Sequence, residues 1–139
     1  MKRRELVSHI MTANVLTVNH TNSLHDAENI LKNNNIRHIP VVSGEKLIGM
    51  LSLTDLLRIS FVESYGNAEA SVDTAVYDML TIEQVMVSNP QSVSQDATIR
   101  EVAEILASKE YHALPVVDGD KLVGIVTTTD LIKYLLEQY

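Results

Sequence analysis

The sequence repeats itself over most of its length, and this duplication constrains the fold more than any other feature. Residues 7–57 align with residues 82–132 without a gap. Chance alone does not produce an ungapped similarity of this length, so the chain is a tandem duplication, and each repeat predicts the structure of the other. The identical pairs include Met11 and Met86, Asn14 and Asn89, Pro40-Val41-Val42 and Pro115-Val116-Val117, and Gly44 and Gly119.

Each repeat contains the same succession of predicted elements: a short leading helix, a brief extended segment, a longer helix, two strands and a closing helix. The longer helices begin at Ser23 and Thr98, because each hydroxyl is followed three residues later by an acid, the pattern of a capping box. Gly44 and Gly119 lie where a tight hairpin turns. The expected ranges are 5–11, 15–18, 39–42 and 47–51 in the first repeat, and 82–86, 91–93, 114–117 and 122–127 in the second.

These elements predict an α/β protein built from two β-α-β-β-α repeats that pack as a pseudo-twofold pair. We expect the first repeat in residues 1–62, a linker and the start of the second leading helix in 63–80, and the second repeat in 81–139. A single repeat of this length buries little surface, so the two are expected to pack together. Within the linker, residues 66–70 are predicted to be mobile and residues 75–80 weakly helical.

The composition argues against several classes of function. The net charge of -7, with the excess of acid in the second half, disfavours nucleic acid as a partner. The absence of cysteine removes disulfides and zinc-thiolate sites. No apolar run approaches the ~20 residues that a membrane-spanning helix needs, and no signal peptide is evident, so we expect a cytoplasmic protein that does not enter a membrane.

The sequence also lacks the patterns of an enzyme. We find no P-loop, no recognisable nucleophile with a neighbouring base, and no spacing typical of metal ligands. His9, His20 and His25 have no counterpart in the second repeat and are predicted to be surface residues rather than metal ligands. Binding without catalysis is therefore the expected activity.

One motif closes the second strand of each repeat and opens the helix that follows. Residues 49–55 and 124–130 both read Gly-x-x-Ser/Thr-x-x-Asp. The hydroxyl and the acid have the spacing of a capping box, which would stabilise the helix start by ~1 kcal/mol. The free amides and positive dipole end of a helix start also suit an anionic ligand.

Together, the Pro-Val-Val strands, the glycine hairpins and the two Gly-x-x-Ser/Thr-x-x-Asp motifs make the chain similar to a tandem pair of CBS domains, known as a Bateman module. The resemblance covers nearly the whole chain. It implies a stand-alone regulatory module with two clefts between the repeats, which bind an adenosine nucleotide (AMP, ADP or ATP) or S-adenosylmethionine. It also implies a homodimer formed through helices, and an effector protein, still unknown, that responds to the change in conformation. No cofactor is expected beyond the adenine nucleotide as a regulatory ligand.

The resemblance assigns roles to individual residues. The hydroxyl and the carboxylate of each motif would hold the ribose and the first phosphate, and the base would lie against the extended segment and the residues around the proline. Basic residues ahead of the proline would reach the phosphates of a nucleotide held by the other repeat, which implies two unequal clefts. The expected contacts are Ser52, Asp55, Thr127 and Asp130 for ribose and phosphate; Leu16, Thr17, Ile39, Pro40, Gln91, Ser92, Leu114 and Pro115 for the base; and Arg37, His38 and His112 for further phosphates.

Two other functions remain open at this point. The chain could be a structural dimerisation module whose clefts are empty or closed by Met50, Ile125 and their neighbours. It could also be a metal-dependent nucleotide hydrolase, although the sequence offers no paired acids for that chemistry.

Overall fold

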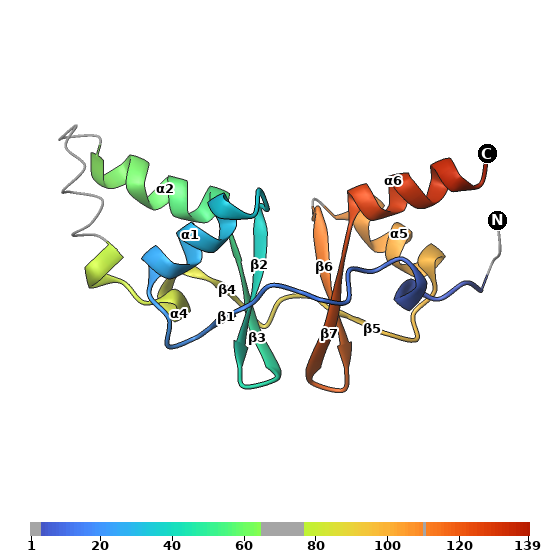
Figure 1. Cartoon of the computed structure of the whole chain (residues 1–139), viewed down its shortest axis with the longest axis horizontal. Helices are drawn as coiled ribbons and strands as arrows, with labels where there is room; N and C mark the ends of the chain where they lie inside the picture. The colour runs from blue at the N-terminus through green and yellow to red at the C-terminus, as the bar shows by residue number, and fades with distance from the viewer. Residues whose placement is uncertain (1–3, 65–76, 110) are drawn as a thin grey trace. The chain divides into compact units, whose positions relative to one another are not determined.

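The chain forms two compact units, each of mixed α/β structure as the sequence predicts (Figure 1). The computed structural model describes residues 4–64, 77–109 and 111–139. The first-repeat unit consists of Leu16–Pro90, and the second-repeat unit consists of Met1–Val15 and Gln91–Tyr139. Each unit contains one set of paired strands with its two long helices on the same side of the central hairpin (Figure 1).

The first-repeat unit is organised around an antiparallel hairpin of β2 and β3. Gly44 turns this hairpin with a φ of 65°, a conformation that favours glycine because it has no Cβ. Strand β1 pairs with β2 in parallel, and β4 pairs with β3 in antiparallel fashion. The elements are β1 (Val18–Asn19), α1 (Leu24–Asn33), β2 (His38–Ser43), β3 (Lys46–Ser52), α2 (Leu53–Ser64), α4 (Ile82–Val85) and β4 (Val87–Ser88).

The second-repeat unit has the same plan. Strands β6 and β7 form the hairpin around Gly119, and β5 pairs with β6 in parallel. A bridge between Thr12 and Ile125 takes the place that the β3–β4 pairing occupies in the other unit. The elements are η1 (Val7–His9), β5 (Val93–Ser94), α5 (Ile99–Ser108), β6 (Ala113–Asp118), β7 (Lys121–Thr127) and α6 (Thr128–Glu137).

Amphipathic helices close each core, as their apolar spacing predicts. In α1, Leu24, Ala27 and Leu31 are fully buried, and in α5, Val102 and Leu106 face the second core. Both helices begin with the predicted capping box, in which the Ser23 or Thr98 side chain and the acid three residues later exchange hydrogen bonds with each other's backbone. Local sequence therefore determines where these helices start and which side they bury.

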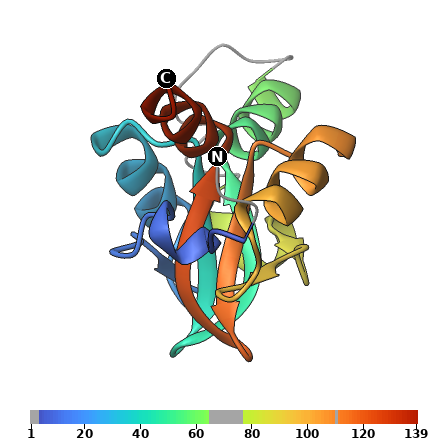
Figure 2. The same ribbon diagram turned by 90° about the vertical axis from the view of Figure 1, so that its right-hand side faces the viewer.

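The two leading segments, residues 4–15 and 77–90, lie in the unit of the opposite repeat. Val7 is fully buried in the core of the second-repeat unit, whereas Tyr77 and Ile82 are buried in the core of the first-repeat unit. Figure 2 faces the second-repeat unit and shows the blue N-terminal segment against the orange-red strands. Each sequence repeat thus lends its first residues to the core of the other.

The first leading segment differs from the helix predicted for residues 5–11. Only Val7–His9 is helical, as a single 3₁₀ turn. Leu6 and Thr12, on either side of it, form β-bridges to Thr98 and Ile125. Because extended pairing occupies both flanks, the helical turn cannot lengthen.

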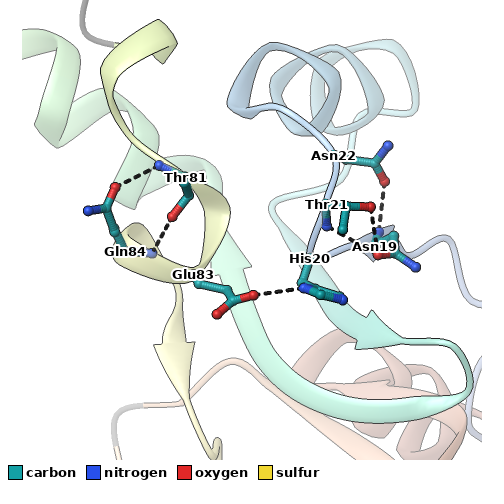
Figure 3. Close-up of polar contacts among 7 residues, drawn as sticks. All are labelled: Asn19, His20, Thr21, Asn22, Thr81, Glu83 and Gln84. Atoms are coloured by element: carbon teal, nitrogen blue, oxygen red, sulfur yellow. Dashed lines mark hydrogen bonds and ion pairs between the residues drawn. The ribbon is translucent and has the colours of Figure 1, made fainter.

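A histidine–carboxylate pair holds the second leading segment against the rest of the first-repeat unit (Figure 3). His20 Nδ1 lies 2.7 Å from Glu83 Oε1, and Glu83 is in the first turn of α4. A capping box between Thr81 and Gln84 begins this four-residue helix. His20 is therefore partnered within the unit.

Tyr77 adds a second point of attachment. Its ring is 4% exposed and meets the ring of His25 edge-on, with centroids 4.9 Å apart. Burial alone would raise the pKa of Glu28, but hydrogen bonds with Lys32 and Tyr77 outweigh this effect and hold the pKa below its ordinary value. The charged Glu28 carboxylate thus supports the docked segment.

The structure describes only part of the linker. The predicted mobile stretch, residues 66–70, lies outside the described residues, as do residues 75 and 76, while residues 77–79 are helical as expected. In the portion of the chain that the structure describes, no helix combines the length and the apolar character that membrane crossing requires.

The exchange of leading segments predicts which fragments fold alone. A fragment of residues 16–90 retains Tyr77 and Ile82 in its core and is expected to unfold cooperatively in urea, followed by circular dichroism. A fragment of residues 1–62 lacks both side chains, and each such loss costs ~3 kcal/mol or more against a total stability of ~5–15 kcal/mol. Cooperative unfolding of fragment 1–62, with none for 16–90, would contradict the exchange.

Candidate functional site

The first junction, where β3 ends at Ser52 and α2 begins, contains the first predicted hydroxyl–acid pair. Ser52 Oγ accepts a hydrogen bond from the Asp55 backbone N–H at 3.0 Å. The Ser52 N–H donates to Asp55 Oδ2 at 3.4 Å in return. These reciprocal bonds form a capping box, so the structural interpretation of this motif is confirmed.

The second junction, where β7 ends at Thr127 and α6 begins, repeats this geometry. Thr127 Oγ1 accepts from the Asp130 N–H at 3.1 Å, and the Thr127 N–H donates to Asp130 Oδ2 at 2.9 Å. Thr127 has the extended backbone of an N-cap residue. Both junctions are therefore closed by the same pair of hydrogen bonds.

Each helix start is also tied to the residue that precedes the first strand of its hairpin. The Leu53 N–H donates to the Arg37 carbonyl at 2.9 Å, and the Thr128 N–H donates to the His112 carbonyl at 3.0 Å. The next amide in each helix has no hydrogen-bond partner among the residues that the structure describes, and these amides belong to Thr54 and Thr129. One N–H at each junction thus remains available at the positive end of the helix dipole.

The groups left over at each junction form a compact set of donors and acceptors. The hydroxyl of Ser52 or Thr127 still has its own proton to donate, since the oxygen has served only as an acceptor. Each aspartate accepts the cap hydrogen bond through Oδ2, so Oδ1 is not part of the cap. A carboxylate oxygen suits the two hydroxyls of a ribose, and an O–H with an N–H suits a phosphate oxygen.

Strand register brings the predicted base-binding residues of the first repeat together. Val18 pairs with Val41 in the parallel β1–β2 ladder, so continuing the register backwards places Leu16 level with Ile39 and Thr17 level with Pro40. Leu16 is 44% exposed, but Ile39 is fully buried in the core. Ile39 therefore has its backbone, rather than its side chain, to offer a ligand.

The second repeat repeats this arrangement. Val93 pairs with Val116, which places Gln91 and Ser92 level with Leu114 and Pro115. The side chain of Leu114 is only 1% exposed and belongs to the core of the second-repeat unit. The equivalence with the first repeat supports the predicted grouping of these residues in each unit, whereas their contact with a base stays a prediction.

The residues predicted to bind further phosphates differ between the units. His38 is half-buried and pairs in register with Ser52, whereas Ala113 holds the equivalent place opposite Thr127. Arg37 and His112 are exposed, and their carbonyls cap the helix starts as described above. The first hairpin therefore brings one more titratable side chain to its junction than the second.

Two further contacts at the junctions were not predicted. The Nη1 atom of Arg58 lies 3.9 Å from Asp55 Oδ1, an ion pair between residues one turn apart on α2.

The motif glycines also have a packing role, because methionines from the leading segments lie on them. The only signal in the sequence was that Met11 and Met86 are themselves an identical pair of the duplication.

The packing at these glycines is tight. A Cβ at Gly49 would lie 2.2 Å from Met86 Sδ, and a Cβ at Gly124 would lie 2.5 Å from Met11 Sδ and 3.0 Å from the Thr12 carbonyl oxygen. Each glycine is three residues before the hydroxyl of its junction. The leading segment is thus held against the same strand that presents the candidate ligand-binding groups.

The structure shows no metal-binding constellation among the residues it describes, where no three His, Asp or Glu side chains converge. His9 and His25, which like His20 have no counterpart in the second repeat, each contact a carboxylate: His9 is 3.4 Å from Glu5, and His25 is 3.6 Å from Asp78. Pairs of this kind contribute to local structure and do not supply the ligand number that a metal site needs.

The comparison with known proteins identifies the family. The CBS domain model matches residues 7–61 and 82–137, so the chain belongs to the CBS domain family and is a tandem CBS pair, or Bateman module. It is 32% identical over 126 residues to the CBS domain-containing protein YhcV of Bacillus subtilis (strain 168), covering 90% of this chain and 81% of YhcV.

Two solved structures show which ligands similar folds hold. CBSX2 of Arabidopsis thaliana, solved in complex with AMP, superposes with a TM-score of 0.81 at 23% identity, covering 96% of this chain and 98% of CBSX2. Protein MJ0100, solved as a CBS pair in complex with 5′-methylthioadenosine and S-adenosyl-L-methionine, has a TM-score of 0.75 at 26% identity, covering 96% and 98%. These CBS pairs bind adenosine-containing ligands.

CBS pairs also occur within longer proteins. The chain spans 47%, 32% and 24% of the length of three curated relatives, the last of which is a homoserine O-acetyltransferase. The family alone therefore assigns no activity to this chain.

The glycine contacts lead to a prediction about stability. Gly124→Ala is expected to destabilise the protein by ~1–3 kcal/mol in urea unfolding, because the new Cβ meets a backbone carbonyl that cannot turn aside. Gly49→Ala is expected to cost less, since only the flexible side chain of Met86 must move. As a control, Gly49→Ala should lower the free energy of unfolding only slightly in a Met86→Ala background. Equal costs in both backgrounds would contradict this packing role.

Proposed function

We propose that this CBS pair is a regulatory module that binds an adenosine ligand at its two strand–helix junctions. The observation that carries the proposal is the set of groups left over at each junction. One carboxylate oxygen, one hydroxyl proton and one helix amide are not used by the cap at either Ser52–Asp55 or Thr127–Asp130. The capping box and a ligand use different atoms of these residues, so the two roles are compatible.

The adenosine part of the ligand is the most strongly supported. MJ0100, at 26% identity, binds two adenosine compounds that carry no phosphate. What these compounds share with AMP, ADP and ATP is the ribose diol and the adenine, which match the aspartate and the strand segments at Leu16–Thr17 and Gln91–Ser92. We propose an adenine nucleotide as the ligand, with S-adenosylmethionine as the alternative.

The proposed role is sensing an energy state or a metabolite without turnover. Ligand binding shifts the protein only if two conformations differ in their affinity for the ligand. Both junctions lie on strands against which a leading segment packs, so a change at a junction would act on a segment from which the chain continues into the other unit. We expect the signal to pass to an effector protein in the cytoplasm.

We further propose that the chain forms a homodimer through α6. Ile132, Leu135 and Leu136 follow helical spacing and are 57%, 43% and 69% exposed, so this stripe does not enter the core as its apolar character would suggest. Tyr134 is the buried residue of the helix instead. An exposed apolar stripe of this kind is typical of a surface that another subunit covers.

The ligand proposal predicts the outcome of a thermal-shift panel. AMP, ADP, ATP, 5′-methylthioadenosine or S-adenosylmethionine at one hundred times its dissociation constant adds ~2.7 kcal/mol of stability. Asp55→Asn with Asp130→Asn should abolish the shift, because asparagine keeps an acceptor for the cap but places a donor amide where ribose needs an acceptor.

The matched control for this panel is Asp120→Asn, in the exposed turn between β6 and β7, which should respond like the wild type. No response of the wild-type protein to any of the five compounds would favour the ligand-free structural module. Release of phosphate from ATP would instead support the hydrolase.

The dimer proposal predicts a change of mass in sedimentation velocity. The wild-type protein should sediment as a dimer, and Leu136→Glu should give the monomer of 15.5 kDa, because a charge cannot be buried unpaired in the interface. Met79→Glu places the same charge on a side chain of the first-repeat unit that is 80% exposed, and it should leave the dimer intact. A monomeric wild-type protein would refute the proposal.

A further inference from the structure

The two junctions differ in the state of the aspartate oxygen that the cap leaves over. At the first junction, Asp55 Oδ1 already has a cationic neighbour, since Arg58 Nη1 is 3.9 Å away. Lys133 holds the equivalent position at the second junction, yet Asp130 has no ion pair with any residue in the described ranges. The duplication thus preserves the positive charge but not the contact.

The cap hydrogen bonds of the two junctions also differ in length. The hydrogen bond from the junction backbone to the aspartate is 3.4 Å long at Asp55 and 2.9 Å long at Asp130. The contact that distinguishes Asp55 from Asp130 is its ion pair with Arg58.

We propose that Arg58 is a specificity-determining residue that competes with the ribose of the ligand for Asp55. This inference rests on the proposed function and deepens it. A ribose that binds at the first junction must displace Arg58 from Oδ1, whereas a ribose at the second junction meets an oxygen with no ion pair to break. The second junction is then the tighter site for an uncharged nucleoside.

The test uses 5′-methylthioadenosine, whose 5′ group is uncharged and offers Arg58 no compensating partner. Calorimetric titration of Asp130→Asn isolates the first junction, and addition of Arg58→Gln to this variant is expected to tighten binding about two- to fivefold, the range for loss of an exposed ion pair. Arg58 is largely exposed, so this substitution should not disturb folding.

The matched control is Lys133→Gln in an Asp55→Asn background, which isolates the second junction and should leave the affinity unchanged. The gain in affinity that Arg58→Gln gives in the Asp130→Asn background should also shrink as salt is raised from about 50 mM to about 1 M, because salt screens the ion pair. A packing role of the arginine side chain would not show this salt dependence.

The possible outcomes separate this inference from the proposed function. If the wild-type protein binds no adenosine compound at millimolar concentration, the proposed function fails and the inference fails with it. If the ligand binds but Arg58→Gln leaves the affinity unchanged or weakens it, only the competition is refuted. If the Asp130→Asn protein binds 5′-methylthioadenosine more weakly than AMP, Arg58→Gln should narrow this difference, and an unchanged difference counts against the competition.

Discussion

The reciprocal hydrogen bonds between a hydroxyl residue and an aspartate at each strand–helix junction are the interaction on which the rest depends. At Ser52–Asp55 and at Thr127–Asp130 they end a buried strand and start a helix within four residues. The turn is short because the hydroxyl accepts from the aspartate N–H in the first turn of the helix, while the carboxylate accepts from the N–H of the hydroxyl residue. The cap does not use one carboxylate oxygen, the hydroxyl proton and one helix amide, and these are the groups that the proposed ligand would use.

The exchange of leading segments places a second constraint on the same strands. Met86 lies on Gly49 and Met11 lies on Gly124, so a Cβ at either glycine would meet a methionine, and at Gly124 it would also meet the Thr12 backbone carbonyl. The strand that ends at each junction therefore contacts a segment from the opposite repeat a few residues before the helix begins. A ligand bound as proposed would contact the same strand as a leading segment, which would give the CBS pair a physical basis for coupling ligand binding to its own conformation.

Duplication does not make the two junctions equal. His38 lies opposite Ser52, where the second repeat has Ala113 opposite Thr127, and Arg58 approaches Asp55 where Lys133 forms no equivalent pair in the described structure. Arginine presents a planar fork that holds a carboxylate, whereas lysine is a flexible point charge, so the substitution changes the contact although it keeps the charge. Divergence at these few positions is how a duplicated protein could come to distinguish two ligands.

The sequence by itself determined the duplication, the α/β class, the hairpins, the capped helices and the hydroxyl–acid pairs, because periodicity, glycine and capping boxes act over a few residues. It also indicated the family, which the match over residues 7–61 and 82–137 confirms. Only the tertiary structure decided that residues 7, 77 and 82 enter the core of the opposite repeat, that the predicted first helix shortens to one turn, and that Arg58 meets Asp55. These features depend on which surfaces compete for a partner across the folded chain, and no local pattern records the outcome of that competition.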